Sequence, residues 1–155
     1  MRFKKLLENK HDYAHAITTD MNKPIKLAIA EVEKCAYLCD YYIENAAKFL
    51  ENQEIKTGWN KSYVTFSPLG VLLGVMPWNF PFWQVFRFVI PSLLTGNVFV
   101  VKHASNVPLS AKALEDVFTI DTIDFPIYKD LSIKSSEVAH VIANPIIKAV
   151  SLTGS

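Results

Sequence analysis

The stretch GVLLGVMPWNFPFWQVF, residues 70–86, places two prolines and one asparagine inside an otherwise apolar run. Its first part, residues 70–76, is a short apolar segment of the kind that forms a buried strand, and residues 82–94 are an apolar helix candidate. A β-branched run, NVFVVK at residues 97–102, follows closely. The stretch therefore predicts a β-α-β unit, and it leaves the lone amide of Asn79 to be explained.

Beyond this unit the chain continues to alternate between helices and strands. The pattern predicts a helix at 108–118, a weak strand at 128–133, a short helix at 135–143 capped by Ser135 or Ser136, and a strong strand at 146–153. Such alternation predicts an α/β fold with a parallel, doubly wound sheet. In the common strand order 3-2-1-4, the first strand lies between the second and the fourth.

The N-terminal third is predicted to be helical. Residues 24–50 carry an apolar stripe with steps of four and three, which predicts one long amphipathic helix with Pro24 in its first turn. An earlier helix is expected over residues 6–18. Residues 55–68 place a Gly-Trp-Asn turn between short extended pieces, which predicts a hairpin. The chain thus divides into an N-terminal helical segment (1–54), the hairpin (55–68) and the sheet segment (69–155).

Composition excludes several classes of function. The chain has 155 residues, half of them hydrophobic, which suffices for one domain with a real core or for part of a larger one. Its 16 basic and 15 acidic side chains nearly balance, so we expect neither nucleic acid nor an anionic membrane as a partner. Prolines and asparagines interrupt the apolar residues 62–101 too often for a membrane-spanning helix.

The cysteines and the N-terminus favour a cytoplasmic location. Cys35 and Cys39 are the only cysteines, and their spacing of four within a helical pattern favours core packing over a disulfide or half of a metal site. Two such cysteines suit a reducing compartment, and the first residues show no apolar export signal. We therefore expect a cytoplasmic protein without a metal site.

Polar residues gather where three of the predicted strands end. Because the carboxyl ends of parallel strands meet at the ligand-binding edge of a doubly wound sheet, we expect these residues to form one site. The segments that contain them are Met76, Pro77, Trp78 and Asn79 after the first strand, Lys102, His103, Ala104 and Ser105 after the second, and Thr153, Gly154 and Ser155 after the fourth.

Three motifs at this edge resemble those of aldehyde dehydrogenases. They are PWNFP with the following FWQVFRF (residues 77–88), GNVFVVKHASNVPLSA (96–111) and VSLTGS (150–155), in the order and approximate spacing of the family. Upstream, residues 21–50 resemble an early helix of the family, with Asn22 where a glycine is usual. PWNFPFWQVFRF and KHASNVP are most similar to succinate-semialdehyde dehydrogenases and their close relatives.

The resemblance implies roles for the residues at this edge. In the family, a cysteine thiolate attacks an aldehyde, a hydride passes to NAD(P)+, and a thioester is hydrolysed. Asn79 matches the asparagine whose amide stabilises the oxyanion of the tetrahedral adduct. Met76, Pro77 and Trp78 match residues that line the cofactor, and Lys102 matches the lysine that holds the adenosine ribose.

The resemblance also implies the cofactor, NADP or NAD. Ser105 stands where many NAD-preferring members carry a glutamate that binds the ribose hydroxyls; a serine can instead donate to a 2′-phosphate, so NADP should be accepted. Gly154 and Ser155 match residues near the pyrophosphate. His103, Ala104 and Thr153 are taken with their neighbours as part of the cofactor site.

By resemblance, residues 69–155 are a partial, Rossmann-like NAD(P)-binding domain, truncated, and the chain is an N-terminal fragment. Neither Cys35 nor Cys39 matches the nucleophile of the family, and the general-base glutamate is not in the matched region. We expect the chain to be inactive alone and to take an aldehyde substrate only when a second chain completes it. The alternatives are a non-catalytic NAD(P)-binding module and an interaction partner of intact dehydrogenase subunits.

Further expectations concern packing and association. Residues 147–153 should form an exposed apolar edge strand, so the chain should self-associate or associate with the remaining dehydrogenase portion. His103 is interpreted as a strand-end residue, and Arg87 as a buried partner for an acid outside the chain. The aromatic residues near Asn79 are expected in the core: Phe80, Phe82, Trp83, Phe86 and Phe88.

Overall fold

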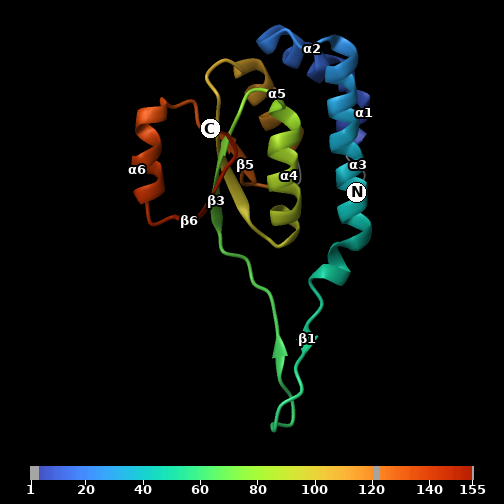
Figure 1. Ribbon diagram of the computed structural model, residues 1–155, viewed down its shortest axis with the longest axis vertical. Helices are drawn as coiled ribbons and strands as arrows, with labels where there is room; N and C mark the ends of the chain where they lie inside the picture. The colour runs from blue at the N-terminus through green and yellow to red at the C-terminus, as the bar shows by residue number, and fades with distance from the viewer. Residues whose placement is uncertain (1–3, 121–122, 155) are drawn as a thin grey trace.

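The computed structural model describes residues 4–120 and 123–154, and its centre is a parallel sheet (Figure 1). The strands are β3 (Val71–Met76), β4 (Val98–His103), β5 (Tyr128–Asp130) and β6 (Ile147–Leu152), in the spatial order β5-β4-β3-β6. This confirms the predicted α/β fold and the strand order 3-2-1-4. Met76 pairs with His103, so β3 and β4 end at the same edge of the sheet.

Helices lie on both faces of the sheet (Figure 1). α4 (Pro81–Leu94) and α5 (Pro108–Phe118) share one face, because two right-handed crossovers in the same direction place their helices on the same side. The 3₁₀ turn η1 (Ser135–Glu137) and α6 (Val138–Ala143) return along the other face. At Gly74 of β3 a Cβ would lie 3.0 Å from the Phe88 ring, so the glycine lets α4 approach the sheet closely.

An N-terminal layer of helices packs against the outer sides of α4 and α5. It consists of α1 (Lys4–Glu8), α2 (Lys10–Met21) and α3 (Ile25–Phe49). The single helix predicted over residues 6–18 is thus two helices that meet at Asn9. The long helix is confirmed, but Pro24 is its N-cap residue rather than part of its first turn. No helix of the described residues is long and apolar enough to cross a membrane.

Asn22 ends α2 in the left-handed conformation, with φ at 57°. Its backbone N–H donates to the carbonyl of Thr18 at 2.8 Å. Asparagine tolerates this conformation better than other residues with a Cβ, so it can take the place of the glycine that the resemblance leads us to expect here. The turn sends the chain directly into α3 and leaves Lys23 on the inner side.

A hairpin is present as a short arm, but its first strand precedes the predicted residues 55–68. β1 (Gln53–Glu54) pairs antiparallel with β2 (Tyr63–Val64), and the arm projects away from the helices and the sheet (Figure 1). Trp59, at its tip, is 84% exposed.

One expectation about side chains is wrong, and one stays a prediction. Arg87 is exposed on α4, where it donates to Gln84 Oε1 at 3.3 Å; its expected partner is an acid outside the chain, so that pairing stays a prediction. Phe80 is 44% exposed, since it lies in the loop before α4 rather than on the inner side of the helix. The other aromatic residues are buried (Phe82, Phe86) or half-buried (Trp83, Phe88).

The start of the segment 135–143 also differs from its prediction. The residue before η1 is Lys134, and its backbone N–H donates to Glu137 Oε2 at 2.8 Å. The glutamate therefore reaches back over the first turn, and neither Ser135 nor Ser136 caps it.

The helices α4 and α5 are capped by carboxylates from the N-terminal layer. Phe80 and Val107 precede them and offer no side-chain acceptor. Glu31 of α3 accepts the N–H groups of Phe82 and Trp83 of α4, both at 3.0 Å. Asp20 of α2 does the same for Leu109 and Ser110 of α5, at 3.2 and 2.7 Å. Carboxylates at these helix starts also complement the helix dipoles.

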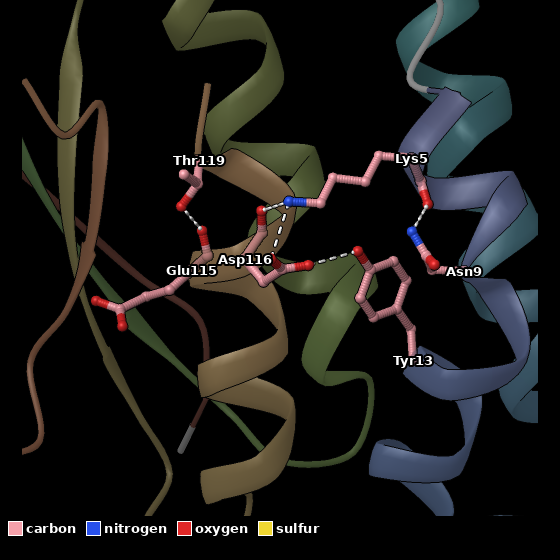
Figure 2. A network of polar contacts seen from close by, with 6 residues as sticks. All are labelled: Lys5, Asn9, Tyr13, Glu115, Asp116 and Thr119. Carbon is pink, nitrogen blue, oxygen red and sulfur yellow. Dashed lines mark hydrogen bonds and ion pairs between the residues drawn. The ribbon is translucent and has the colours of Figure 1, made fainter. Parts of the chain in front are cut away.

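The other end of α5 is joined to α1 and α2 by a polar network (Figure 2). Lys5 Nζ contacts Asp116 Oδ1 at 2.9 Å and also donates to the Asp116 carbonyl. Tyr13 donates its hydroxyl hydrogen to Asp116 Oδ2 at 2.9 Å. A cation at the last carbonyls of a helix is favourable for the helix dipole. The bond from Lys5, and then that from Tyr13, lower the pKa of Asp116 against the opposing effect of burial.

We expect this network to stabilise the fold in a pH-dependent way. Because the pKa of Asp116 is lower in the folded chain, its contribution is complete above the unfolded pKa and is lost as the pH falls through the folded pKa, a window of about pH 4 and below. Both partners are partly exposed, so the loss in Asp116→Asn at neutral pH should be below about 1 kcal/mol. Urea unfolding of both variants and the wild type, from neutral to acid pH, measures this contribution. The control is Asp40→Asn, which changes an exposed residue of α3. An equal pH response in the two variants would contradict a stabilising role of Asp116.

Candidate functional site

A cleft of about 590 Å³ lies at the carboxyl edge of the sheet, between the ends of β3, β4 and β6. The structure brings most of the predicted site residues together there. The cleft is lined by Val75, Met76, Pro77, Trp78, Asn79, Gln84, Lys102, Ala104, Leu152, Thr153 and Gly154. Of these, Val75, Gln84 and Leu152 were not singled out by the sequence. The predicted Ser155 lies outside the described residues.

Asn79 stands in an exposed loop between β3 and α4. Trp78 beside it is 50% exposed, and both residues line the cleft. A hydrogen bond fixes the backbone of the loop, because Lys23 Nζ donates to the carbonyl oxygen of Asn79 at 3.0 Å. The loop therefore combines a fixed backbone with side chains that are open to a ligand.

Lys23 and Glu31 were missed by the sequence reasoning. Their side chains are 8% and 1% exposed, and they form an ion pair. One signal in the sequence could have found Glu31: it lies three residues after Ala28 and four before Cys35, on the apolar stripe of the long helix. A charge on such a stripe needs a buried partner.

Lys102 occupies the floor of the cleft at the end of β4. It is 7% exposed, and its ammonium donates to the neutral hydroxyl of Ser135 at 3.3 Å. A buried ammonium is costly unless it finds strong acceptors, so this position suits an oxygen-rich or anionic ligand. Ser135, from η1, is a further residue that the sequence gave no reason to place here.

His103 faces the other side of β4. It is 6% exposed, and its Nε2 lies 2.7 Å from the hydroxyl of Tyr128 on β5. Burial, and then the neighbouring Lys102, lower the pKa of His103 to about 4, so the imidazole is neutral at neutral pH. The side chain of His103 points toward Tyr128 and not into the cleft, which supports its interpretation as a strand-end residue.

Ser105 borders a second cavity of about 400 Å³, next to the cleft. The two hollows share Ala104. The second cavity lies between the start of α5 and the segment that links β5 to η1, and it also includes His103, Lys134 and Glu137. The predicted site is therefore divided, with Ser105 on the far side of the β4 end from Asn79.

The two cysteines lie away from both cavities, in α3. Cys35 and Cys39 are fully buried, as their packing interpretation predicts. Burial raises the pKa of Cys35 well above its usual range and that of Cys39 to about 12. Among the described residues, no group of three His, Cys, Asp or Glu side chains could hold a metal ion.

Comparison with known proteins gives a consistent result. Residues 1–155 match the family model described as the aldehyde dehydrogenase family. The chain is 44% identical over 153 residues to a probable succinate-semialdehyde dehydrogenase [NADP(+)] of Synechocystis sp., covering 97% of this chain and 33% of that protein. It is also 44% identical over 154 residues to a succinate-semialdehyde dehydrogenase [NADP(+)] of Mycobacterium avium, with the same coverage.

The fold agrees with that of a solved relative. The structure of succinic semialdehyde dehydrogenase from Streptococcus pyogenes, in complex with NADP+ as the cofactor, superposes with a TM-score of 0.93 at 35% identity, over 99% of this chain and 34% of that one. The chain thus spans about a third of the length of these relatives. Together with the match of the family model to all 155 residues, these likenesses show that the chain belongs to the aldehyde dehydrogenase family.

Proposed function

We propose that this chain supplies the oxyanion-stabilising amide and part of the NADP+ site of a succinate-semialdehyde-type aldehyde dehydrogenase, which oxidises an aldehyde to a carboxylic acid. The observation that carries the proposal is the cleft, where Asn79, Lys102 and Thr153 converge from three strand ends. This is the edge at which doubly wound sheets bind ligands. The match to relatives that carry this activity in their names supports the reaction class.

Asn79 is proposed to stabilise the oxyanion. Asn79 lines the cleft, and the NH₂ donor of its side chain is suited to the negative oxygen that develops when a nucleophile adds to an aldehyde. One such donor typically contributes about 3 kcal/mol to the transition state. The donor acts on charge formed by another group, so Asn79 needs a nucleophile from elsewhere to take part in turnover.

Lys102 and Ser105 are proposed to hold the adenosine end of NADP+. Lys102 presents a buried ammonium whose observed partner is a neutral hydroxyl, and it can therefore donate to ribose oxygens or to a phosphate. Ser105 is exposed on the adjoining cavity and can donate to a 2′-phosphate. When bound, the cofactor would accept the hydride, while these residues bind and orient it. Two of the relatives are named for NADP(+), in agreement with this choice.

We expect NADP+ to bind at least as tightly as NAD+, and Ser105→Glu to weaken NADP+ binding about tenfold, because a carboxylate would repel the 2′-phosphate. Binding to the wild-type chain should be weak, since the site covers only part of a dinucleotide. Calorimetry with both cofactors measures this. Ser67→Glu adds the same charge at an exposed position outside both cavities and should change neither affinity. A strong preference of the wild type for NAD+ would contradict the proposal.

The partner is proposed to be another protein chain that pairs with β6. Along this edge strand Lys148, Val150 and Leu152 are exposed, the last at 69%. Edge strands with apolar side chains recruit other strands. For the chain alone we expect self-association and binding of the dye ANS, both reduced in Val150→Lys but not in Leu27→Lys, which changes an exposed leucine on α3. Size-exclusion chromatography with ANS fluorescence measures both. A monodisperse wild-type monomer without ANS signal would contradict this.

A further inference from the structure

The loop that carries Asn79 rests on the buried ion pair of Lys23 and Glu31. Three groups surround the ammonium of Lys23: the Glu31 carboxylate, the carbonyl oxygen of Asn79 at 3.0 Å, and the ring of Phe80, whose centroid is 3.8 Å away. An ammonium has three N–H donors. Each of its neighbours is a hydrogen-bond acceptor or an aromatic face that binds a cation, so these three groups can satisfy the ammonium of Lys23 beside the loop.

Glu31 holds the end of the same loop. One carboxylate oxygen binds Lys23, and the other accepts the N–H groups of Phe82 and Trp83, both at 3.0 Å. These donors belong to the first turn of α4, immediately after Pro81. The loop therefore has three attachments: the β3 ladder at Met76, Lys23 at Asn79, and Glu31 at the start of α4.

The cost of this arrangement argues for a role beyond stability. A buried ion pair rarely stabilises a fold more than apolar side chains of similar size would, because both charges lose their hydration. An amide that stabilises an oxyanion, in contrast, must be in place before the charge develops, and small displacements cost large factors in rate. A bond to the backbone carbonyl of Asn79 fixes the backbone from which the side chain extends and leaves the amide free to bind a ligand.

We propose that Lys23 and Glu31 are positioning residues, which hold the backbone of Asn79 so that its side-chain amide faces the cleft. The inference rests on the proposed role of Asn79, but it predicts an order in the loop that can be measured without cofactor, substrate or turnover. It also predicts that the effect is specific to this carboxylate cap. Asp20 caps α5 by the same chemistry, and its two bonds go to the start of α5 rather than to the loop, which makes it a matched control.

The experiment is NMR spectroscopy of the ¹⁵N-labelled 155-residue chain, with the Val150→Lys background if self-association broadens the signals. The side-chain amide signals of Asn79 are assigned by their loss in Asn79→Asp. Two readouts are followed: the position of these signals, and the heteronuclear NOE of the backbone amides of Asn79 and Phe80. The variants are Lys23→Met, the double variant Lys23→Met/Glu31→Gln, and Asp20→Asn.

The double variant keeps the test decisive if Lys23→Met fails to fold, because it leaves no charge unpaired and its glutamine carbonyl can still accept the N–H groups of α4. We expect it to retain the signals of α4, while the backbone amides of Asn79 and Phe80 lose their NOE and the Asn79 side-chain signals change position. Asp20→Asn should move the signals of Leu109 and Ser110 and leave Asn79 unchanged.

Two results would overturn the inference: a folded double variant in which the Asn79 signals are unchanged, or an equal disturbance of Asn79 in Asp20→Asn. NADP+ is added only after these spectra are recorded. Failure of NADP+ to bind would then count against the proposed function, whereas loss of loop order in the unliganded double variant, with Asn79 intact in Asp20→Asn, would support the positioning role.

Discussion

Glu31→Ala is expected to lower the free energy of unfolding by about 3–5 kcal/mol, the usual cost of removing one partner of a buried ion pair. The substitution leaves Lys23 buried without its carboxylate, since only 8% of the lysine side chain is exposed. It also removes the acceptor of two N–H groups at the start of α4. Unsatisfied buried donors add to the loss. The measurement is urea unfolding followed by circular dichroism.

The matched control is Glu33→Ala, two residues along the same helix. Glu33 also forms an ion pair, with Lys10 at 2.6 Å, but 47% of its side chain is exposed. Exposed pairs contribute about 1 kcal/mol or less, because water and salt screen them. Comparable losses of unfolding free energy in the two variants would show that burial does not make the Lys23–Glu31 pair more important for stability than an exposed pair.

Purified 155-residue chain is expected to form no NAD(P)H from succinate semialdehyde or simple aldehydes. The reaction of the family begins with a thiolate, and both cysteines of this chain are fully buried in α3. Burial raises the pKa of each thiol, to about 12 for Cys39, so neither is ionised at neutral pH. Asn79 can stabilise an oxyanion but cannot form one, and without the nucleophile the later steps do not follow.

The assay is made with both cofactors, and with a complete succinate-semialdehyde dehydrogenase as the positive control. Asn79→Ala is assayed in parallel and should give the same background as the wild type. Turnover by the wild-type chain that disappears in Cys35→Ala or Cys39→Ala would overturn the expectation, because it would identify one of the buried thiols as a nucleophile.

The sequence by itself determined the elements of the fold and the edge at which the site lies. Residues 71–76 and 98–103 are strands in the structure, and 108–118 is a helix with the predicted bounds. Such elements follow from local periodicity and from prolines and glycines at their ends, which act over a few residues. Asn79, Lys102 and Thr153 could be grouped in advance because parallel strands bring their carboxyl ends to one edge.

Only the tertiary structure decided how the site is held and how it is divided. Glu31 and Asp20 accept N–H groups that lie 51 and 90 residues further along the chain, and neither Phe80 nor Val107 provides a side-chain cap of its own. The direction of His103 toward Tyr128 depends on the pairing of β4 with β5, which places the two side chains on one face. These features arise from long-range packing between the N-terminal layer, the helices and the sheet, because a buried charge or amide takes whichever partner the assembled fold brings within hydrogen-bond distance.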